Sequence, residues 1–265
     1  KKHNIKFFET GLRHGTITAI IHDNRFEITS LRKDINTDGR HADVVFTTDW
    51  KVDASRRDFS INSIYSDIQG NLFDPYNGKK DLESGKIIFN GDPEKRIKED
   101  YLRILRYIRF FLNYSKKEHD KNYIRTIKKN LDGILKISSE RLLDEFKKLV
   151  KSDGFLNLAN DSFSSQIISL IFPQFKNISV LKSLNKYAKE NINNLDFIFL
   201  ISLMVVDGSD NADYFIYKFN ISKKDQKRIL FLNDFVKNNK NNNLNLKNLW
   251  KIFYFNGKGS LFDLI

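Results

Sequence analysis

The sequence predicts an α+β protein in which a β-containing N-terminal part is followed by an all-helical remainder. Three observations support this prediction. Short runs of β-branched or alternating residues lie before residue 50, turn signals concentrate between residues 70 and 90, and apolar residues recur at helical spacing from Pro93 onward. The chain has 265 residues, of which 40% are hydrophobic, so it is long enough to bury a sizeable core.

Three β-strands are expected near the N-terminus, at Thr16–Ile21, Arg25–Leu31 and Asp43–Thr48. The first and third are rich in β-branched residues, which favour strands. The middle run alternates, with Phe26 and Ile28 on one face and Glu27 on the other. The polar stretch 34–42 separates the last two strands, and its Asp38-Gly39 pair predicts a turn.

A helix is expected to begin near Asp53 and to carry residues 56–65. Turn signals then follow at Gly70, Asp74-Pro75 and Asn77-Gly78. These signals indicate a hairpin around residues 71–90, which would end the β-containing part.

From Pro93 onward the pattern becomes helical. One helical face carries the apolar residues Tyr101, Ile104, Leu105, Ile108 and Phe111. Ser138-Ser139-Glu140 precedes a second amphipathic helix, with apolar residues at Leu142, Leu143, Phe146 and Leu149. Residues 155–265 are expected to be mostly helical, with breaks near Pro173, at 207–210 and in the Asn-rich stretch 238–243.

The charge balance favours a polyanionic partner. Lys and Arg exceed Asp and Glu by 45 − 33 = 12, and phosphates bound by such side chains release condensed counterions. Solubility alone is the open alternative. The absence of cysteine excludes disulfides and thiolate zinc sites. The longest apolar run, Leu195–Val206, is shorter than the roughly 20 residues that span a bilayer, so no membrane is expected.

The string Arg56-Arg57-Asp58-Phe59-Ser60-Ile61-Asn62 is the first candidate for binding chemistry. On a helix, Asp58 and Asn62 are four residues apart and share a face. Arg57 can donate a fork of hydrogen bonds to phosphate oxygens, while a carboxylate and an amide on one face can bracket a ribose hydroxyl. The spacing leaves open a plain surface helix with an Arg–Asp ion pair.

The second candidate is Asp100 with Arg103, three residues apart and expected one helical turn apart on one face. Cytosine and adenine both present an exocyclic amino donor beside a ring-nitrogen acceptor. A carboxylate accepts and a guanidinium donates, so one Asp–Arg pair can satisfy either base. Uracil and guanine offer a carbonyl beside an N–H and would leave the pair mismatched, which a buried site rejects strongly. An exposed salt bridge is the open alternative.

Two further signals lie in the β-containing part. Glu27 faces away from its apolar neighbours and is a candidate metal ligand in a cleft. The charged loop with Asp34, Asp38, Gly39 and Arg40 has a glycine hinge, as expected of a segment that moves over a site. A solvent-facing carboxylate and an ordinary connector are the respective alternatives.

The order of the motifs is more specific than any one of them. They are Gly15-Thr16-Ile17-Thr18, Phe26-Glu27-Ile28-Thr29-Ser30-Leu31-Arg32, Thr37-Asp38-Gly39-Arg40-His41-Ala42, Phe46-Thr47-Thr48-Asp49-Trp50, Arg56-Arg57-Asp58-Phe59-Ser60-Ile61-Asn62, Glu99-Asp100-Tyr101-Leu102-Arg103-Ile104-Leu105-Arg106-Tyr107 and Ser139-Glu140-Arg141. In this order they resemble the class II tRNA nucleotidyltransferase and bacterial poly(A) polymerase family. The resemblance covers residues 11–150, and residues 31–62 look closest to the CCA-adding members of mitochondria and related bacteria.

The resemblance implies an activity and a division of the chain. Such enzymes add C, C and A to the 3′ end of tRNA from CTP and ATP without a nucleic-acid template. A head domain with a mixed β-sheet is implied at residues 1–90, a base-selecting helical neck at 91–154, and a tRNA-holding body with part of a tail at 155–265. The bacterial cytoplasm, favoured over the mitochondrial matrix, is the implied compartment.

The resemblance also implies residue roles. The residues expected to contact the triphosphate and ribose are Arg56, Arg57, Asp58 and Asn62. Those expected to form the protein template for the base are Glu99, Asp100 and Arg103, with Arg106 beside them. Glu27 matches a catalytic, Mg²⁺-binding carboxylate, and the segment with Asp34, Asp38, Gly39 and Arg40 matches the flexible loop associated with the switch to A addition. Ser139-Glu140-Arg141 matches a structural motif of the neck.

One feature of the family is not found in these 265 residues. An Asp-x-Asp pair that binds two magnesium ions is expected a few tens of residues before Gly11, so the chain by itself is expected to be an inactive portion. Two other functions stay open. One is a poly(A) polymerase of the same family, which uses ATP alone, and the other is a non-catalytic RNA-binding module.

Overall fold

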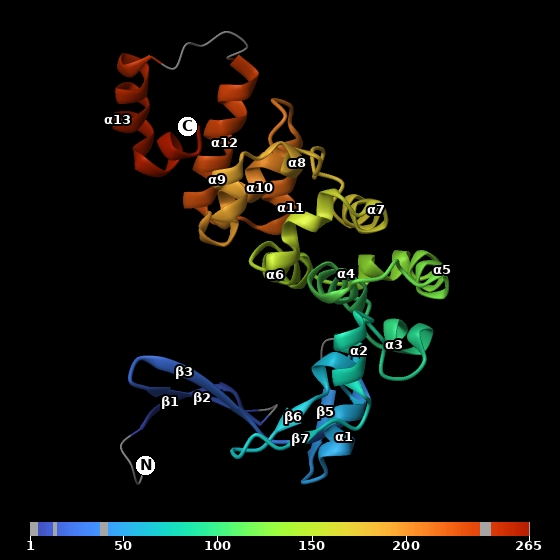
Figure 1. The fold of residues 1–265 in the computed structure, drawn as a ribbon. Coiled ribbons are helices and arrows are strands. Elements are labelled where there is room, and N and C mark those ends of the chain that lie inside the picture. The colour runs from blue at the N-terminus through green and yellow to red at the C-terminus, as the bar shows by residue number, and fades with distance from the viewer. Residues whose placement is uncertain (1–4, 13–14, 38–41, 239–244, 265) are drawn as a thin grey trace. The chain divides into compact units, whose positions relative to one another are not determined.

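A computed structural model of the chain describes residues 5–12, 15–37, 42–238 and 245–264 (Figure 1). Two compact units divide these residues. The first comprises Lys1–Arg103 with Ser115–Asn130, and the second comprises Ile104–Tyr114 with Leu131–Ile265. The α+β class is confirmed. The division into head, neck and body at residues 90 and 154 stays a prediction.

The N-terminal unit holds the β-structure of the described chain. A three-stranded antiparallel sheet contains β1 (Lys6–Gly11), β2 (Thr16–Ile21) and β3 (Asn24–Thr29), with β2 in the centre. Two antiparallel pairs follow, β4 (Arg32–Thr37) with β5 (Ala42–Phe46) and β6 (Tyr65–Ser66) with β7 (Leu72–Phe73). The described strands therefore pair antiparallel, and the mixed sheet implied by the resemblance is not found among them.

The predicted secondary structure of two segments in this unit is wrong. Residues 34–37, expected to be loop, belong to β4, because their backbone pairs with β5 although three of their four side chains are polar. Residues 78–84, expected within a hairpin, form helix α2 (Gly78–Ser84). The hairpin that does form joins β6 to β7 and turns at residues 67–70, where Asp67 accepts N–H bonds from Gln69 and Asn71.

Helices complete the N-terminal unit around a small core. They are α1 (Trp50–Ser55), α2, α3 (Pro93–Glu99) and α5 (Lys121–Lys129). Phe59, Ile97 and Ile127 are fully buried. Phe59 packs on Phe89 with ring centroids 4.8 Å apart, and this contact joins the segment after α1 to the segment before α3.

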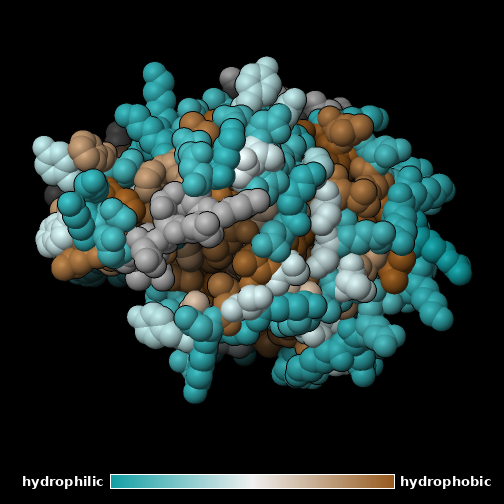
Figure 2. Space-filling view, turned by 90° about the horizontal axis from the view of Figure 1, so that it is seen from above, coloured by the Kyte–Doolittle hydropathy of each residue, from teal (hydrophilic) through white to brown (hydrophobic). Residues whose placement is uncertain are grey.

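The described part of the second unit is helical. Its elements are α4 (Arg103–Tyr114, which starts in the first unit), η3 (Leu131–Lys136), α6 (Ser139–Val150), η4 (Asp153–Ala159), α7 (Ser162–Ile171), α8 (Val180–Ser183), α9 (Lys186–Glu190), η5 (Ile192–Asn194), α10 (Phe197–Val205), α11 (Asn211–Phe219), α12 (Lys223–Asn238) and α13 (Leu246–Phe262). Hydrophilic side chains dominate the face in Figure 2, with hydrophobic patches between them. Within the described chain, no helix is long and apolar enough to cross a membrane.

The helical faces predicted from periodicity pack as expected, with one exception. On α4, Ile104, Leu105 and Ile108 are buried. Ser138 caps α6 by accepting the N–H of Arg141. The exception is Glu145 of α6, which is buried and accepts a 2.7 Å hydrogen bond from Arg109 Nε. A buried carboxylate requires such a partner, and apolar spacing does not reveal it.

Candidate functional site

The segment Arg56–Asn62 is not an α-helix. Helix α1 ends at Ser55 with Arg56 as its C-cap, and Phe59 is extended, with φ −134° and ψ 156°. Main-chain hydrogen bonds join this segment to residues 88–90, from Ser60 N to Ile88 O (2.9 Å) and from Asn90 N to Asp58 O (3.0 Å). Pairing with a segment some 30 residues away and burial of Phe59 outweigh the local helical spacing.

The predicted common face of Asp58 and Asn62 is therefore wrong. Asn62 ends a 3₁₀ turn, η2 (Ser60–Asn62), and its Oδ1 accepts the N–H of Phe59 at 3.1 Å. Helix α2 begins against this turn at Gly78. A Cβ at Gly78 would lie 2.1 Å from Ser60 O, so this close approach requires glycine.

Asp53 organises the two arginines of the motif, although the sequence predicted only that a helix starts near it. Its side chain is 1% exposed. Arg56 Nε lies 2.9 Å from Oδ1, Arg57 Nη2 lies 3.2 Å from Oδ2, and Arg32 donates its backbone N–H at 3.0 Å. Burial would raise the pKa of Asp53, but hydrogen bonds from Tyr65, Arg32 and Arg56 outweigh it and lower this pKa.

Arg57 keeps an exposed edge in this arrangement. Its side chain is 40% exposed, and its guanidinium carbon lies 5.5 Å from the centroid of the Tyr65 ring. The Tyr65 hydroxyl in turn donates to Asp53 Oδ2 at 2.6 Å. Arg57 is therefore held from one side by a carboxylate and an aromatic ring, while another side stays open to an anion.

Tyr65→Phe tests this network and its pH dependence. The loss of a hydrogen bond to a charged group is expected to lower the free energy of unfolding by about 1.5–3 kcal/mol. Burial and the bond to Asp53 raise the pKa of Tyr65 to about 12. The folded pKa of Tyr65 exceeds its unfolded value of about 10. The contribution of the Tyr65–Asp53 hydrogen bond to the free energy of unfolding is therefore complete below pH 10 and is lost towards pH 12.

Urea unfolding at pH 7, 10 and 11 measures both effects. In a Trp250→Phe background the fluorescence of Trp50, whose ring centroid lies 5.1 Å from that of Tyr65, reports the N-terminal unit. The difference in free energy of unfolding between Tyr65→Phe and the parent protein should narrow above pH 10. Tyr76→Phe is the matched control, and equal losses in both variants would contradict the prediction.

Arg103 lies against Asp58, which brings the two candidate motifs together. Arg103 Nε donates to Asp58 Oδ1 at 2.6 Å, and both side chains are 10% exposed. Arg103 Nη1 donates to Glu99 Oε2 at 2.7 Å. The Asp58 and Arg103 positions lie 45 apart in sequence, so this contact depends on the pairing of residues 58–60 with 88–90.

The predicted helical spacing of Asp100 and Arg103 is wrong. Helix α3 ends at Glu99 and α4 begins at Arg103, while Asp100 lies between them in extended conformation, with φ −151° and ψ 105°. The Asp100 carboxylate accepts the N–H of Leu102 at 3.2 Å, as a residue that caps a following helix does. Asp100 thus lies three residues before Arg103 in a turn, not on the same helical face.

Two residues that the sequence did not single out hold this region. Arg96 donates through Nη2 to the carbonyls of Arg56 and Arg57, at 2.7 and 2.8 Å, and through Nη1 to Glu99 at 2.6 Å. Asn90 is buried, and its Nδ2 bonds to Ala54 O and Arg57 O at 3.2 Å. Burial and repulsion by Arg103 lower the pKa of Arg96. The contacts of both residues with residues 54–57 have no local sequence signal, because the carbonyls that they bind lie more than 30 positions away.

Arg106 belongs to the second, helical unit, whereas Arg103 belongs to the N-terminal unit. The Nε of Arg106, which lies on α4, is 3.6 Å from Glu145 Oε2. Arg109, one turn later, also contacts Glu145. The role of Arg106 beside a base-selecting pair stays a prediction.

Glu27 lies exposed on the edge strand β3, opposite Thr18 of β2. Over the described residues, no group of three or more His, Asp or Glu side chains gathers that could hold a metal ion. The described residues therefore do not by themselves gather a magnesium site, and the role of Glu27 stays a prediction. Asp34 is in β4 with Arg32 Nε at 3.5 Å, whereas Asp38, Gly39 and Arg40 lie outside the described residues.

Comparisons with known proteins agree with the motifs. Residues 1–88 match the family described as the Poly A polymerase head domain. The mitochondrial CCA tRNA nucleotidyltransferase 1 of Mus musculus is 40% identical over 235 residues, 87% of this chain and 52% of that protein. The Homo sapiens protein of the same name is 51% identical over 142 residues, 53% of this chain and 33% of that protein. The CCA-adding enzyme of Lactobacillus helveticus is 39% identical over 146 residues, 54% and 36% of the two chains.

The chain spans about half, or less, of the length of these relatives. Solved structures show the same fold. The CCA-adding enzyme of Bacillus stearothermophilus in complex with CTP aligns with a TM-score of 0.65 and 22% identity, over 87% of this chain and 56% of that one. The Thermotoga maritima CCA-adding enzyme complexed with tRNA aligns with a TM-score of 0.57 and 17% identity, over 95% and 58%.

The motif order, the match of the N-terminal third and the shared fold agree with one another. Residues 1–88 therefore match the Poly A polymerase head domain family, and the resemblance of the chain to the class II nucleotidyltransferases is confirmed.

Proposed function

We propose that the protein adds C, C and A to the 3′ end of tRNA from CTP and ATP, and that these 265 residues bind and select the incoming nucleotide. Relatives named for this activity are 39–51% identical over their matched segments, which supports the proposal. The observation that carries it is the approach of Arg103 to Asp58 and Glu99. It gathers residues of both candidate motifs in one region of the N-terminal unit.

The proposed selection uses hydrogen-bond complementarity. Asp58 and Glu99 engage Nε and Nη1 of Arg103 and so orient its fork. A guanidinium also carries N–H groups on Nη2, which in this proposal donate to the ring nitrogen of cytosine or adenine. Asp100, in the turn before Arg103, accepts from the exocyclic amino group. Uracil and guanine present the reverse pattern and would leave both groups unsatisfied.

The proposed reaction is displacement at phosphorus. The 3′ hydroxyl oxygen of the tRNA bonds to the α-phosphorus, the bond from that phosphorus to the pyrophosphate oxygen breaks, and the hydroxyl proton leaves to solvent. Arg56 and Arg57 would bind the triphosphate, because Asp53 holds both guanidinium groups in place. Asp58 and Asn62 stay proposed neighbours of the ribose.

Magnesium is part of the proposal only because the resemblance to the family implies it. Glu27 would be one ligand, and the described residues do not supply the others, so no step is assigned to the metal. Residues 155–265 are proposed to hold the tRNA, and 91–154 to form the neck. Mitochondrial and bacterial proteins are both among the relatives, and the bacterial cytoplasm is the proposed compartment.

Calorimetric titration of the 265-residue chain with CTP, ATP, UTP and GTP tests the selection without requiring catalysis. CTP and ATP should bind with similar affinity, and UTP and GTP at least about tenfold more weakly, because each leaves buried polar groups unpaired. Asp100→Ala should remove this discrimination. Asp132→Ala, at a carboxylate outside the candidate motifs, is the matched control, and equal binding of all four nucleotides by the parent chain would refute the proposal.

A poly(A) polymerase of the same family is the second candidate, because the matched head domain carries that name. It predicts that ATP binds and that CTP does not. A non-catalytic RNA-binding module predicts no selective nucleotide binding and no effect of Asp100→Ala. The same titrations therefore separate the three functions.

A further inference from the structure

A groove in the N-terminal unit combines apolar walls with acidic residues. It is lined by Thr48, Asp49, Trp50, Asp67, Asn71, Leu72 and Phe73, and its volume is about 430 Å³. Sites for small molecules have volumes of about 300–1,000 Å³, so the groove is large enough for one. Residues 48–50 lead into α1, whereas residues 67–73 form the turn and second strand of the β6–β7 hairpin. None of the lining residues belongs to the candidate nucleotide site.

Aromatic rings form much of the wall of this groove. Trp50, Leu72 and Phe73 are 40%, 56% and 41% exposed, so part of their apolar surface is left in water. The ring centroids of Trp50 and Phe73 lie 6.2 Å apart, and the ring planes meet at 74°. Tyr65 packs against both rings, with its centroid 5.1 Å from that of Trp50. The three rings hold one another in place, so a ligand would meet walls that are already formed.

Two carboxylates also line the groove. Asp49 caps α1, where its Oδ1 accepts the N–H groups of Lys51 and Val52 at 2.8 and 3.3 Å. Asp67 accepts hydrogen bonds from the side chain and backbone of Asn71, which lower the pKa of Asp67 and favour its charged form. Among the residues that the structure describes, no Lys, Arg or His nitrogen lies within ion-pair distance of either carboxylate. Two such carboxylates in a chain with a net charge of +12 favour a cationic ligand from outside.

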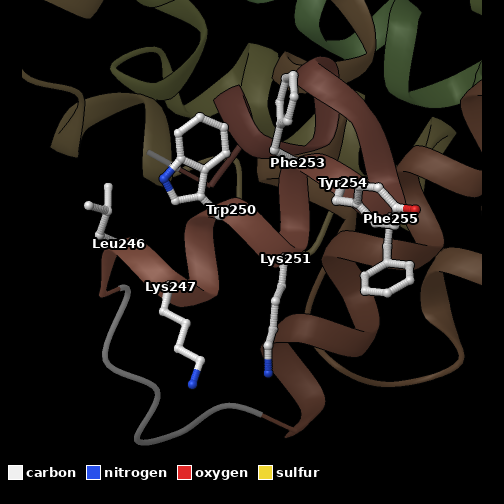
Figure 3. Close-up of a pocket in the computed structure, with 7 residues that line it drawn as sticks. All are labelled: Leu246, Lys247, Trp250, Lys251, Phe253, Tyr254 and Phe255. Carbon is white, nitrogen blue, oxygen red and sulfur yellow. The ribbon is translucent and has the colours of Figure 1, made fainter.

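The groove on helix α13 has aromatic walls but the opposite charge (Figure 3). It is lined by Leu246, Lys247, Trp250, Lys251, Phe253, Tyr254 and Phe255, a set with two lysines and no carboxylate. A cation is repelled there although aromatic rings are present. The α13 groove is therefore an internal control for the contribution of Asp49 and Asp67.

The ligand that fits the first groove has two positive charges on an apolar stem. Aromatic rings attract a cation, and carboxylates form charge-assisted hydrogen bonds with ammonium groups. Methylenes between two ammonium groups can bury apolar surface against Leu72 and Phe73. Hydrated Mg²⁺ has the same charge, but it gains nothing from apolar walls. The combination of rings, Leu72 and two carboxylates therefore favours an organic diammonium ion over a metal ion.

We propose that the groove between the start of α1 and the β6–β7 hairpin binds a linear alkyl diammonium ion of the polyamine class. One ammonium group pairs with Asp49 and the other with Asp67, while the methylene chain lies against Trp50, Leu72 and Phe73. The inference goes beyond the proposed function, because nucleotide selection uses none of these residues.

Trp50 fluorescence tests binding directly in the full 265-residue chain. Trp250→Phe leaves Trp50 as the sole tryptophan, and putrescine, a butyl chain with an ammonium group at each end, should change its emission in a saturable way. Butylamine, which has the same chain and one charge, should bind at least about fivefold more weakly. Trp50→Phe leaves only Trp250 of the α13 groove, whose emission should stay constant. Constant ionic strength excludes a general salt effect.

Charge-removing variants test the two carboxylates. Asp49→Asn and Asp67→Asn keep an oxygen that accepts the local N–H bonds, so both variants are expected to fold. Each should weaken putrescine binding about fivefold through the loss of one ion pair. Asp120→Asn is the matched control, because Asp120 caps α5 of the same unit through two N–H bonds, at 2.8 and 3.1 Å, and lies outside the groove.

A ring-removing variant tests the aromatic wall independently of charge. Phe73→Leu keeps an apolar side chain but removes the ring that attracts a cation, and it should weaken putrescine binding about threefold. Phe253→Leu, in the α13 groove, is the control. Asp100→Ala should bind putrescine normally, and Asp49→Asn should still select CTP and ATP, so this inference and the proposed function fail separately.

Three results would overturn the inference. They are no change in Trp50 emission up to about 10 mM putrescine, equal affinities for putrescine and butylamine, and equal affinities of Asp49→Asn and Asp120→Asn. Displacement of putrescine by an equal concentration of Mg²⁺ would also overturn it, because the site would then accept any divalent cation. Tighter binding of a dilysine peptide than of putrescine would instead assign the groove to a basic protein segment.

Discussion

Arg103→Met is expected to lower the free energy of unfolding of the N-terminal unit by about 3–5 kcal/mol. The cause is Asp58, whose carboxylate is 10% exposed and would stay buried without its 2.6 Å partner. An unpaired buried charge is costly, whereas the pair itself contributes little beyond a well-packed apolar pair. Urea unfolding followed by Trp50 fluorescence in the Trp250→Phe background measures the loss. Arg125→Met, at an exposed arginine of α5 in the same unit, is the control.

The double variant Asp58→Leu with Arg103→Met separates stability from binding. Replacing both charges by apolar side chains should recover most of the stability lost in the single variant. Selective binding of CTP and ATP should not return, because the guanidinium that is proposed to donate to the base is still missing. Recovery of selective binding in the double variant would show that Arg103 acts only through the fold.

Asp53→Asn is expected to lower the free energy of unfolding by about 3 kcal/mol. Asp53 is 1% exposed and is the counter-charge of Arg56 and Arg57. This loss lies at the lower end of the range expected when a buried ion pair loses one partner, because Arg57 is 40% exposed and water screens its charge. Asp23→Asn is the control, since Asp23 is exposed with φ 62°, a conformation that asparagine also adopts.

Acid titration provides an independent test of Asp53. Its pKa is lowered in the folded protein, so its contribution is complete above the unfolded value of about 3.9 and is lost as pH falls through the folded pKa. The stability difference between the parent protein and Asp53→Asn should therefore narrow below about pH 4. A difference that stays constant down to about pH 2 would contradict the assigned hydrogen bonds.

Local sequence patterns determined much of the secondary structure and the order of the motifs. The β-branched run Thr16–Ile21 is β2, and the apolar face of α4 is buried where periodicity placed it. The sequence also predicts the start of α6 at Ser138, which caps this helix. These features depend on neighbours within one turn or on one strand face, so the spacing of side chains along the chain is sufficient to predict them.

Only the tertiary structure decided how the candidate site is assembled. Helical spacing predicted Asp58 with Asn62 and Asp100 with Arg103, yet the contact that forms joins Asp58 to Arg103 across 45 positions. Burial of Phe59 against Phe89 and the main-chain bonds of residues 58–60 to 88–90 stop the helix that local spacing favours. The buried carboxylate of Asp53 was missed for the same physical reason, because a charge is stable in a protein interior only with partners that the fold brings to it.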